Sequence, residues 1–205
     1  MTAGDPQPEM AGVITALASE WAPTYGRDVV EAVVLDSWER LAGTLAAPAA
    51  RHVEAFSRER LSARAQAEGR VAPAVPQILF LTAEDAARGQ MAAALLDRAA
   101  SGRVGTRSAG AEPAEAVLPA AVEAMAAIGV DLSSAFPKPL TEEVQRAADL
   151  VVTIGPVPGP GAAAGGESNA WDDVPDPVGR DFRTVCEIRD VLVSHVERLL
   201  ARLAA

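Results

Sequence analysis

The residues with the clearest chemical potential lie between positions 77 and 94, where QILFLT leads through AEDAA into RGQMAAA. Gln77–Leu81 is an apolar run of strand length, and Gln90–Ala100 is rich in strong helix formers. A strand that turns so tightly into a helix directs several backbone N–H groups toward one point, at the positive end of the helix dipole. Arg88 adds a planar, two-pronged donor. The pattern predicts a cradle for an oxyanion.

This stretch resembles the active-site loop of the low-molecular-weight protein tyrosine phosphatases and of the related thioredoxin- or mycothiol-coupled arsenate reductases. Their signature is a cysteine, five residues, an arginine, and then serine or threonine. The resemblance places Thr82 at the nucleophilic cysteine, Arg88 at the oxyanion-binding arginine, and Gly89 at the hydroxyl residue that stabilises the thiolate. The implied anion-binding loop comprises Thr82, Ala83, Glu84, Asp85, Ala86, Ala87, Arg88 and Gly89.

The resemblance extends over roughly residues 77–203 and includes segments outside the loop. The matching segments are Gln90–Ala92 after the arginine, Arg107–Gly110 at the second strand, Pro137–Leu140 in a connection, Ala148–Gly155 at the third strand, and Asp176–Pro177. In the family the last of these supplies the general acid, so the resemblance implies that Asp176 protonates the leaving group. The alternative is that Asp176 and Pro177 only form a turn before the last helix.

The replacement at position 82 decides the expected activity. An active relative needs a thiolate, and a helix N-terminus together with an arginine can lower the pKa of a thiol below neutrality. An aliphatic hydroxyl starts several pKa units higher, so even a decrease of ~5 units in its pKa leaves it protonated at neutral pH. Arsenate reduction also needs sulfur to carry electrons, and Gly155–Asn169, near which arsenate reductases commonly place another cysteine, has none. We expect a non-catalytic or catalytically impaired relative that acts through binding or dimerisation. The alternative is phosphatase or arsenate reductase activity with unusual chemistry or a borrowed thiol.

Two carboxyl residues, Glu84 and Asp85, lie within the loop. A carboxylate ~4 Å from a bound oxyanion opposes it by on the order of 4 kcal/mol at an effective dielectric of 20. Asp85 stands where the family usually has asparagine, and Asp tolerates the left-handed backbone that such a loop needs. Because Arg88 and the loop N–H groups are costly to leave without partners, we expect one of these carboxylates to fill the cradle. External anions should then bind poorly, and acid should weaken the loop.

The following elements must position this loop. Expected strands are Val104–Ser108 and Leu150–Ile154; expected helices are Leu118–Ile128, Thr141–Ala148 with Thr141 as its cap, and 182–203. Alternation of strands and helices predicts an α/β fold, a small parallel sheet with helices on both faces and ligands at the carboxyl ends of the strands. Gly155–Asn169 has little to pack and is expected to be flexible.

We place a domain boundary in the Gly- and Pro-containing linker 67–76, which gives domains 1–69 and 70–205. Residues 9–67 show three apolar helical stripes and predict a three-helix bundle, with Trp21 and Trp38 as core residues. Its core is thin for an independent unit, so packing on another copy or on the second domain should supply burial. Sequences that resemble this one carry a dimerisation domain here. A homodimer is expected.

The formal charge of −10 leaves no general basic surface for nucleic acid or an anionic membrane. Four arginines of the third helix could form a nucleic-acid face: Arg51, Arg58, Arg60 and Arg64. Residues 1–70 nevertheless carry ten acidic and seven basic side chains, a net of −3, which favours a solvated face. The single cysteine, Cys186, lies next to the apolar stripe of the last helix and is interpreted as an inert small hydrophobe, with a redox thiol as the alternative. We expect a cytoplasmic protein without metal or cofactor, whose partner is a phosphate-like anion or another protein.

Overall fold

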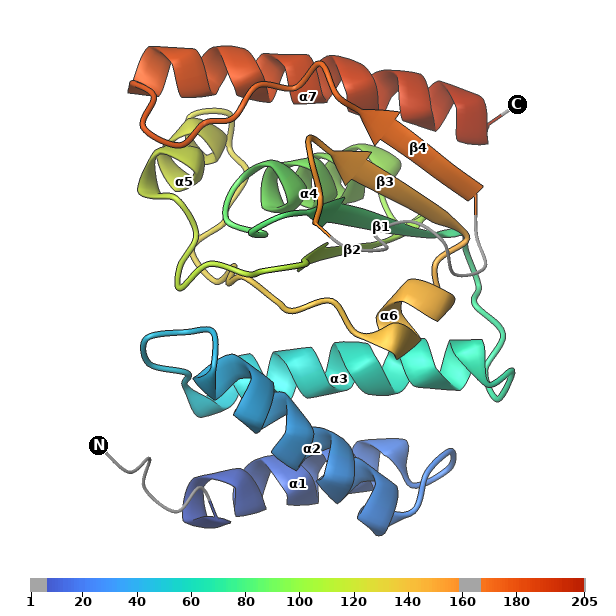
Figure 1. The fold of residues 1–205 in the computed structure, drawn as a ribbon. Coiled ribbons are helices and arrows are strands. Elements are labelled where there is room, and N and C mark those ends of the chain that lie inside the picture. The colour runs from blue at the N-terminus through green and yellow to red at the C-terminus, as the bar shows by residue number, and fades with distance from the viewer. Residues whose placement is uncertain (1–6, 159–166, 205) are drawn as a thin grey trace.

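A computed structural model describes residues 7–158 and 167–204, and a four-stranded parallel sheet lies at the centre of its C-terminal part (Figure 1). Its strands are β1 (Gln77–Thr82), β2 (Gly105–Gly110), β3 (Leu150–Ile154) and β4 (Glu167–Trp171). They follow the spatial order β2-β1-β3-β4. The expected α/β fold with a preceding helical segment is confirmed.

Helices cover both faces of this sheet (Figure 1). On one face lie α4 (Arg88–Ala100), α5 (Pro119–Ala126) and α7 (Phe182–Leu203); on the other lie α6 (Glu142–Arg146) and α3 (Ala50–Ala67). Successive strand residues point to opposite faces, so Phe80 of β1 packs with the first group of helices and Leu81 with the second. Every residue of β1 is buried, as expected of a central parallel strand.

The N-terminal helices α1 (Gln7–Trp21) and α2 (Arg27–Ala42) pack with α3 around their own apolar core. The partly buried Trp21 and Trp38 lie against this core. Helix α3 also faces the sheet, where Ala63 packs with Leu79 and Leu81. It therefore belongs to two layers, and the sheet supplies burial that the three helices alone lack.

Three of the four arginines of α3 lie among carboxylates, and the fourth, Arg51, is exposed. Arg58 pairs with Glu20 and Glu54, Arg64 pairs with Glu68, and Arg60, which is only 6% exposed, pairs with Asp36 and Glu143. These pairs leave little free positive charge on α3 for a nucleic acid. Within residues 7–158 and 167–204, no helix is both long and apolar enough to cross a membrane.

Two expectations for the local structure are wrong. Glu167–Asn169, assigned to a flexible stretch, begins β4; this edge strand is mostly exposed and lacks apolar alternation, so only its pairing with β3 and the burial of Trp171 define it. The rest of that stretch includes 159–166, which lie outside the described residues. Thr141 precedes α6, but its side chain makes no capping hydrogen bond.

Candidate functional site

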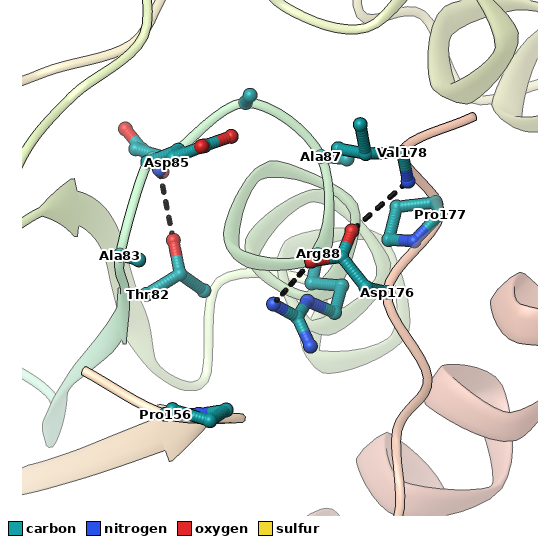
Figure 2. Close-up of a pocket in the computed structure, with 11 residues that line it drawn as sticks. Thr82, Ala83, Asp85, Ala87, Arg88, Pro156, Asp176, Pro177 and Val178 are labelled. Carbon is teal, nitrogen blue, oxygen red and sulfur yellow. Dashed lines mark hydrogen bonds and ion pairs between the residues drawn. The ribbon is translucent and has the colours of Figure 1, made fainter.

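A pocket of about 190 Å³ lies at the carboxyl end of β1. Its walls are the loop Thr82–Arg88, Pro156 just after β3, and the segment Asp176–Val178 that leads to α7 (Figure 2). Because β2 and β3 flank β1 on opposite sides, the connections diverge here and leave a crevice. The fold thus brings the predicted loop and Asp176 together, although Gly89 is not among the lining residues.

Arg88, the first residue of α4, reaches into this pocket with a side chain that is 11% exposed. Its Nη1 donates to the carbonyl oxygen of Val174 at 3.1 Å, and its Nη2 lies 3.5 Å from Oδ2 of Asp176. Gly155 closes the other side: a Cβ there would lie 2.6 Å from Nη1, and its φ of +71° also favours glycine. The guanidinium is therefore held by backbone from two segments.

The carboxylates of the loop do not pair with Arg88, contrary to the expectation that one of them fills the cradle. Within the described residues, Asp176 is the only carboxylate at ion-pair distance from Arg88. Asp176 also forms the turn considered above, because its Oδ1 accepts a hydrogen bond from the backbone N–H of Val178 at 2.9 Å (Figure 2). One side chain thus shapes the turn and faces the arginine, while remaining 59% exposed.

Thr82 is the last residue of β1 and is only 4% exposed. Its hydroxyl oxygen accepts a hydrogen bond from the backbone N–H of Asp85 at 2.9 Å, so it lies within the arc of the loop (Figure 2). Gly89 lies directly behind: a Cβ there would be 3.3 Å from Cγ2 of Thr82 and 3.0 Å from Oδ1 of Asp85. The two changed signature positions are therefore in steric contact.

Asp85 does not fill the cradle, which corrects the expectation of a self-occupied loop. It has the expected left-handed backbone, with φ of 50°, but its fully buried side chain points behind the loop. There Oδ2 accepts hydrogen bonds from Gln90 Nε2 at 2.8 Å, Ser108 Oγ at 3.3 Å and the Lys138 backbone N–H at 3.0 Å. Three converging donors outcompete the single arginine, and Glu84 is exposed.

Burial raises the pKa of Asp85 to about 7, although the nearby Lys138 charge and the hydrogen bonds from Lys138 and Ser108 act to lower it. Its Oδ1 is buried and has no hydrogen-bond partner among the described residues. That oxygen is the natural place for a proton, because Oδ2 already receives three donors. Asp85 is consequently a neutral acid at mildly acidic pH.

This pKa predicts the opposite of an acid-sensitive loop. The unfolded carboxyl has a pKa near 3.8, so between about pH 4 and pH 7 the folded protein keeps a proton that the unfolded chain has lost. Stability therefore falls as pH rises through this window, by about 4 kcal/mol at most. Asp85→Asn should remove this slope. Chemical denaturation of the native protein and of Asp85→Asn at pH 5 and pH 8 tests this. If the two proteins differ in free energy of unfolding by the same amount at both pH values, the prediction is contradicted.

Lys138 connects the loop to the N-terminal helices. Its backbone N–H holds Asp85, and its Nζ pairs with Oε2 of Glu59 on α3 at 2.8 Å. Burial acts to lower the pKa of Lys138, but the negative charges of Glu59 and Asp85 outweigh burial and raise it. The family resemblance pointed to the segments that contain Ser108 and Lys138. Sequence reasoning did not reveal that these segments hold Asp85.

The described residues contain no group of three or more His, Cys, Asp or Glu side chains arranged to hold a metal ion. The carboxyl residues Glu84, Asp85 and Asp176 line this pocket, together with the Thr82 hydroxyl, the Arg88 guanidinium and the N-terminus of α4. The hydroxyl, the guanidinium and the helix N-terminus suit an anionic oxygen ligand.

Comparison with known proteins gives a consistent pattern. Residues 77–156 match the family model of low molecular weight phosphotyrosine protein phosphatases. The thioredoxin-dependent arsenate reductase of Corynebacterium glutamicum is similar over 98% of both chains, with 31% identity and a TM-score of 0.85. An arsenate reductase in a phosphate-binding state matches 63% of this chain and 99% of its own, with 23% identity and a TM-score of 0.57. A cysteine-to-serine mutant of the YwlE arginine phosphatase, with a phosphorylated active-site serine, matches 62% and 95%, with 24% identity and a TM-score of 0.52.

Proposed function

Because this chain belongs to the family of low-molecular-weight phosphotyrosine phosphatases and arsenate reductases, we propose that it binds phosphate-like anions without turning them over. The observation that carries this proposal is Thr82, whose hydroxyl occupies the end of β1 within the arc of the loop. In the proposal this hydroxyl stands in the position of the nucleophilic thiol. A binding loop is kept while its catalytic sulfur is lost.

A hydroxyl there cannot support repeated turnover at neutral pH. The Asp85 N–H, Arg88 and the N-terminus of α4 all favour negative charge, but a threonine hydroxyl begins several pKa units above a thiol. Gly89 also lacks the hydroxyl that the family uses to stabilise the thiolate. Both changes act in the same direction, so the loop lacks the thiolate of the family and the hydroxyl that stabilises it.

Anion binding is supported by what the pocket retains. Arg88 is held in place by the Val174 carbonyl and by the close backbone of Gly155, and among the described residues neither Glu84 nor Asp85 forms an ion pair with it. Among the relatives, one arsenate reductase is described in a phosphate-binding state. The YwlE mutant bears a phosphoserine in its active site. These relatives support the idea that such a loop holds a phosphoryl group even when a hydroxyl replaces the thiol.

An enzyme with a borrowed thiol is the competing possibility. Cys186 lies on α7, is half-buried, and is not among the residues that line the pocket. Nothing in its placement directs its thiol toward Thr82. We therefore retain this possibility only as an outcome of the following experiment.

The test combines binding and turnover. Calorimetric titration with phosphate at constant ionic strength should show one site, and Arg88→Ala should weaken it by at least about tenfold, because a charge-assisted hydrogen bond contributes roughly 1.5–3 kcal/mol. Hydrolysis of an aryl phosphate, and arsenate reduction with a thioredoxin or mycothiol system, should stay at background. Turnover that is lost in Arg88→Ala but kept in Cys186→Ser would contradict the proposal.

Asp176 should weaken anion binding, because it is the carboxylate that faces Arg88. Asp176→Asn removes this competing charge while an amide oxygen still accepts from the Val178 N–H. The carboxylate is largely exposed, so its repulsion of a bound anion is about 1 kcal/mol, and phosphate affinity should rise roughly fivefold. The Asp173→Asn variant, which changes a charge outside the pocket lining, is the matched control. Equal affinities in all three proteins would show that Asp176 does not compete.

We also propose that the protein forms a homodimer through its N-terminal helices. The partly buried Trp21 and Trp38 remain the candidate anchors, and the buried Nε1 of Trp21 has no hydrogen-bond partner in the described part of this chain. Sedimentation of the intact protein should show a dimer that Trp38→Glu dissociates. Phe182→Glu, at an exposed site on α7, should leave it intact. A monomeric native protein would reject this arrangement.

A further inference from the structure

We propose that Thr82 accepts a phosphoryl group from acyl phosphates and then retains it as a stable phosphothreonine. This proposal rests on the anion-binding role proposed above and makes that role more specific, because the bound anion becomes a covalent mark. Each protein molecule would react with a single donor molecule. It would then store the group instead of releasing it.

The position of the hydroxyl carries the first step. Thr82 is 4% exposed, yet it lines the pocket, and its oxygen is fixed by the Asp85 N–H at 2.9 Å. That hydrogen bond occupies one lone pair of the oxygen. Within the described residues the hydroxyl donates no hydrogen bond, so its proton remains available for release. A nucleophilic oxygen therefore lies in the same pocket as Arg88.

The surrounding groups suit a phosphoryl group in transfer. Negative charge on its equatorial oxygens would meet the Arg88 guanidinium and the positive end of the α4 dipole. Phosphoryl transfer passes through a loose transition state in most analyses, so catalysis is largely positioning and charge stabilisation. A weak nucleophile is acceptable in such a reaction, provided that the leaving group departs easily.

Leaving-group chemistry makes the reaction one-way. The Thr82 oxygen forms a new O–P bond as the bond between phosphorus and the acyl oxygen breaks; a carboxylate leaves with the electron pair, and the hydroxyl proton passes to water. Hydrolysis of the product would require the threonine alkoxide to leave, and this is a far stronger base than a carboxylate or a thiolate. Phosphothreonine should therefore accumulate to one group per chain.

The experiment uses acetyl phosphate and the intact protein. Mass spectrometry should show the gain of one phosphoryl group, distinct in mass from acetylation, and fragmentation should place it on Thr82. Thr82→Ser keeps the hydroxyl and should also be labelled, whereas Thr82→Val keeps the shape and should not. Arg88→Ala should slow labelling by about a hundredfold, the typical effect of losing one charge-stabilising donor.

Other outcomes would overturn the inference. Labelling of Thr82→Val to the native extent, or labelling at another residue, would exclude Thr82 as the acceptor. Phosphate titration of the same preparations separates this inference from the proposed function. Phosphate binding without phosphoryl transfer rejects only the phosphothreonine, whereas failure of both rejects the anion-binding role as well. Circular dichroism of each variant confirms folding, and the Thr82→Ser and Arg88→Ala comparison decides the question if Thr82→Val does not fold.

Discussion

Replacing Thr82 with cysteine and Gly89 with serine in the same molecule should create a phosphatase, with aryl phosphate hydrolysis at least about a hundredfold above the native background. Cysteine supplies a thiolate that the Asp85 N–H, Arg88 and the N-terminus of α4 can stabilise. It also supplies a leaving group that water can displace, so the phosphoenzyme turns over. Arsenate reduction should remain absent, because the single native cysteine lies outside the pocket.

Neither replacement alone should suffice. In Gly89→Ser the new Cβ would lie 3.3 Å from Cγ2 of Thr82 and 3.0 Å from Oδ1 of Asp85, so the loop would have to shift. Thr82→Cys removes that methyl group but still lacks the activating hydroxyl. We expect each single variant to stay at least about tenfold below the double variant.

Two control variants separate the contributions of the introduced hydroxyl and of Arg88. Thr82→Cys/Gly89→Ala restores the Cβ without the hydroxyl, so its shortfall measures the contribution of the hydroxyl alone. Adding Arg88→Ala to the double variant should return hydrolysis to background, because the guanidinium in the pocket is then lost. A double variant no more active than the native protein would show that the loop lacks more than its sulfur.

Lys138→Met should cost about 3–5 kcal/mol of unfolding free energy, the effect of breaking a buried ion pair from one side. The Lys138 side chain is 15% exposed, and Glu59, its partner at 2.8 Å, is 20% exposed. Without the ammonium group, the shielded Glu59 carboxylate loses its ion-pair partner, and Asp85 loses the cation that lowers its pKa. Denaturant unfolding of the intact protein measures this loss.

The matched control is Glu59→Gln/Lys138→Met, which removes both charges of the pair. Replacing both partners of a buried pair is often neutral, so the double variant should recover most of the lost stability. Glu59→Gln alone should be the milder single change, because Lys138 still faces Asp85. If the double variant is as unstable as Lys138→Met, the methylene packing of Lys138 and not its charge holds this contact.

This pair also gives the N-terminal helices a role at the site. Glu59 belongs to α3, Lys138 holds Asp85 through its backbone N–H, and Asp85 helps to shape the loop around Thr82. The pair Arg60–Glu143 and the hydrogen bond from Arg107 to Gln66 provide further links between α3 and the α/β part. Helix α3 is thus a structural support of the sheet, whatever part it plays in dimerisation.

The sequence alone determined the elements whose information is local. The apolar run at Gln77–Leu81, the tight turn and the helix-forming segment after it predicted β1, the loop and α4, and the spacing of apolar residues predicted α7. The fold class followed from the alternation of strands and helices. Strand β4 was missed because four of its five residues are polar or small, and because its pairing with β3 is not visible in the local sequence.

Only the tertiary structure decided what the charged groups of the loop do. Asp85 and Arg88 are three residues apart, and sequence proximity suggested that they pair. The fold instead brings Ser108 and the Lys138 backbone to Asp85, and brings Asp176 and the Val174 carbonyl to Arg88. A short loop leaves both side chains free to turn either way, so their directions depend on partners that distant segments supply. Strong local patterns therefore predict strands and helices from the sequence, whereas the orientation of a polar side chain depends on long-range packing.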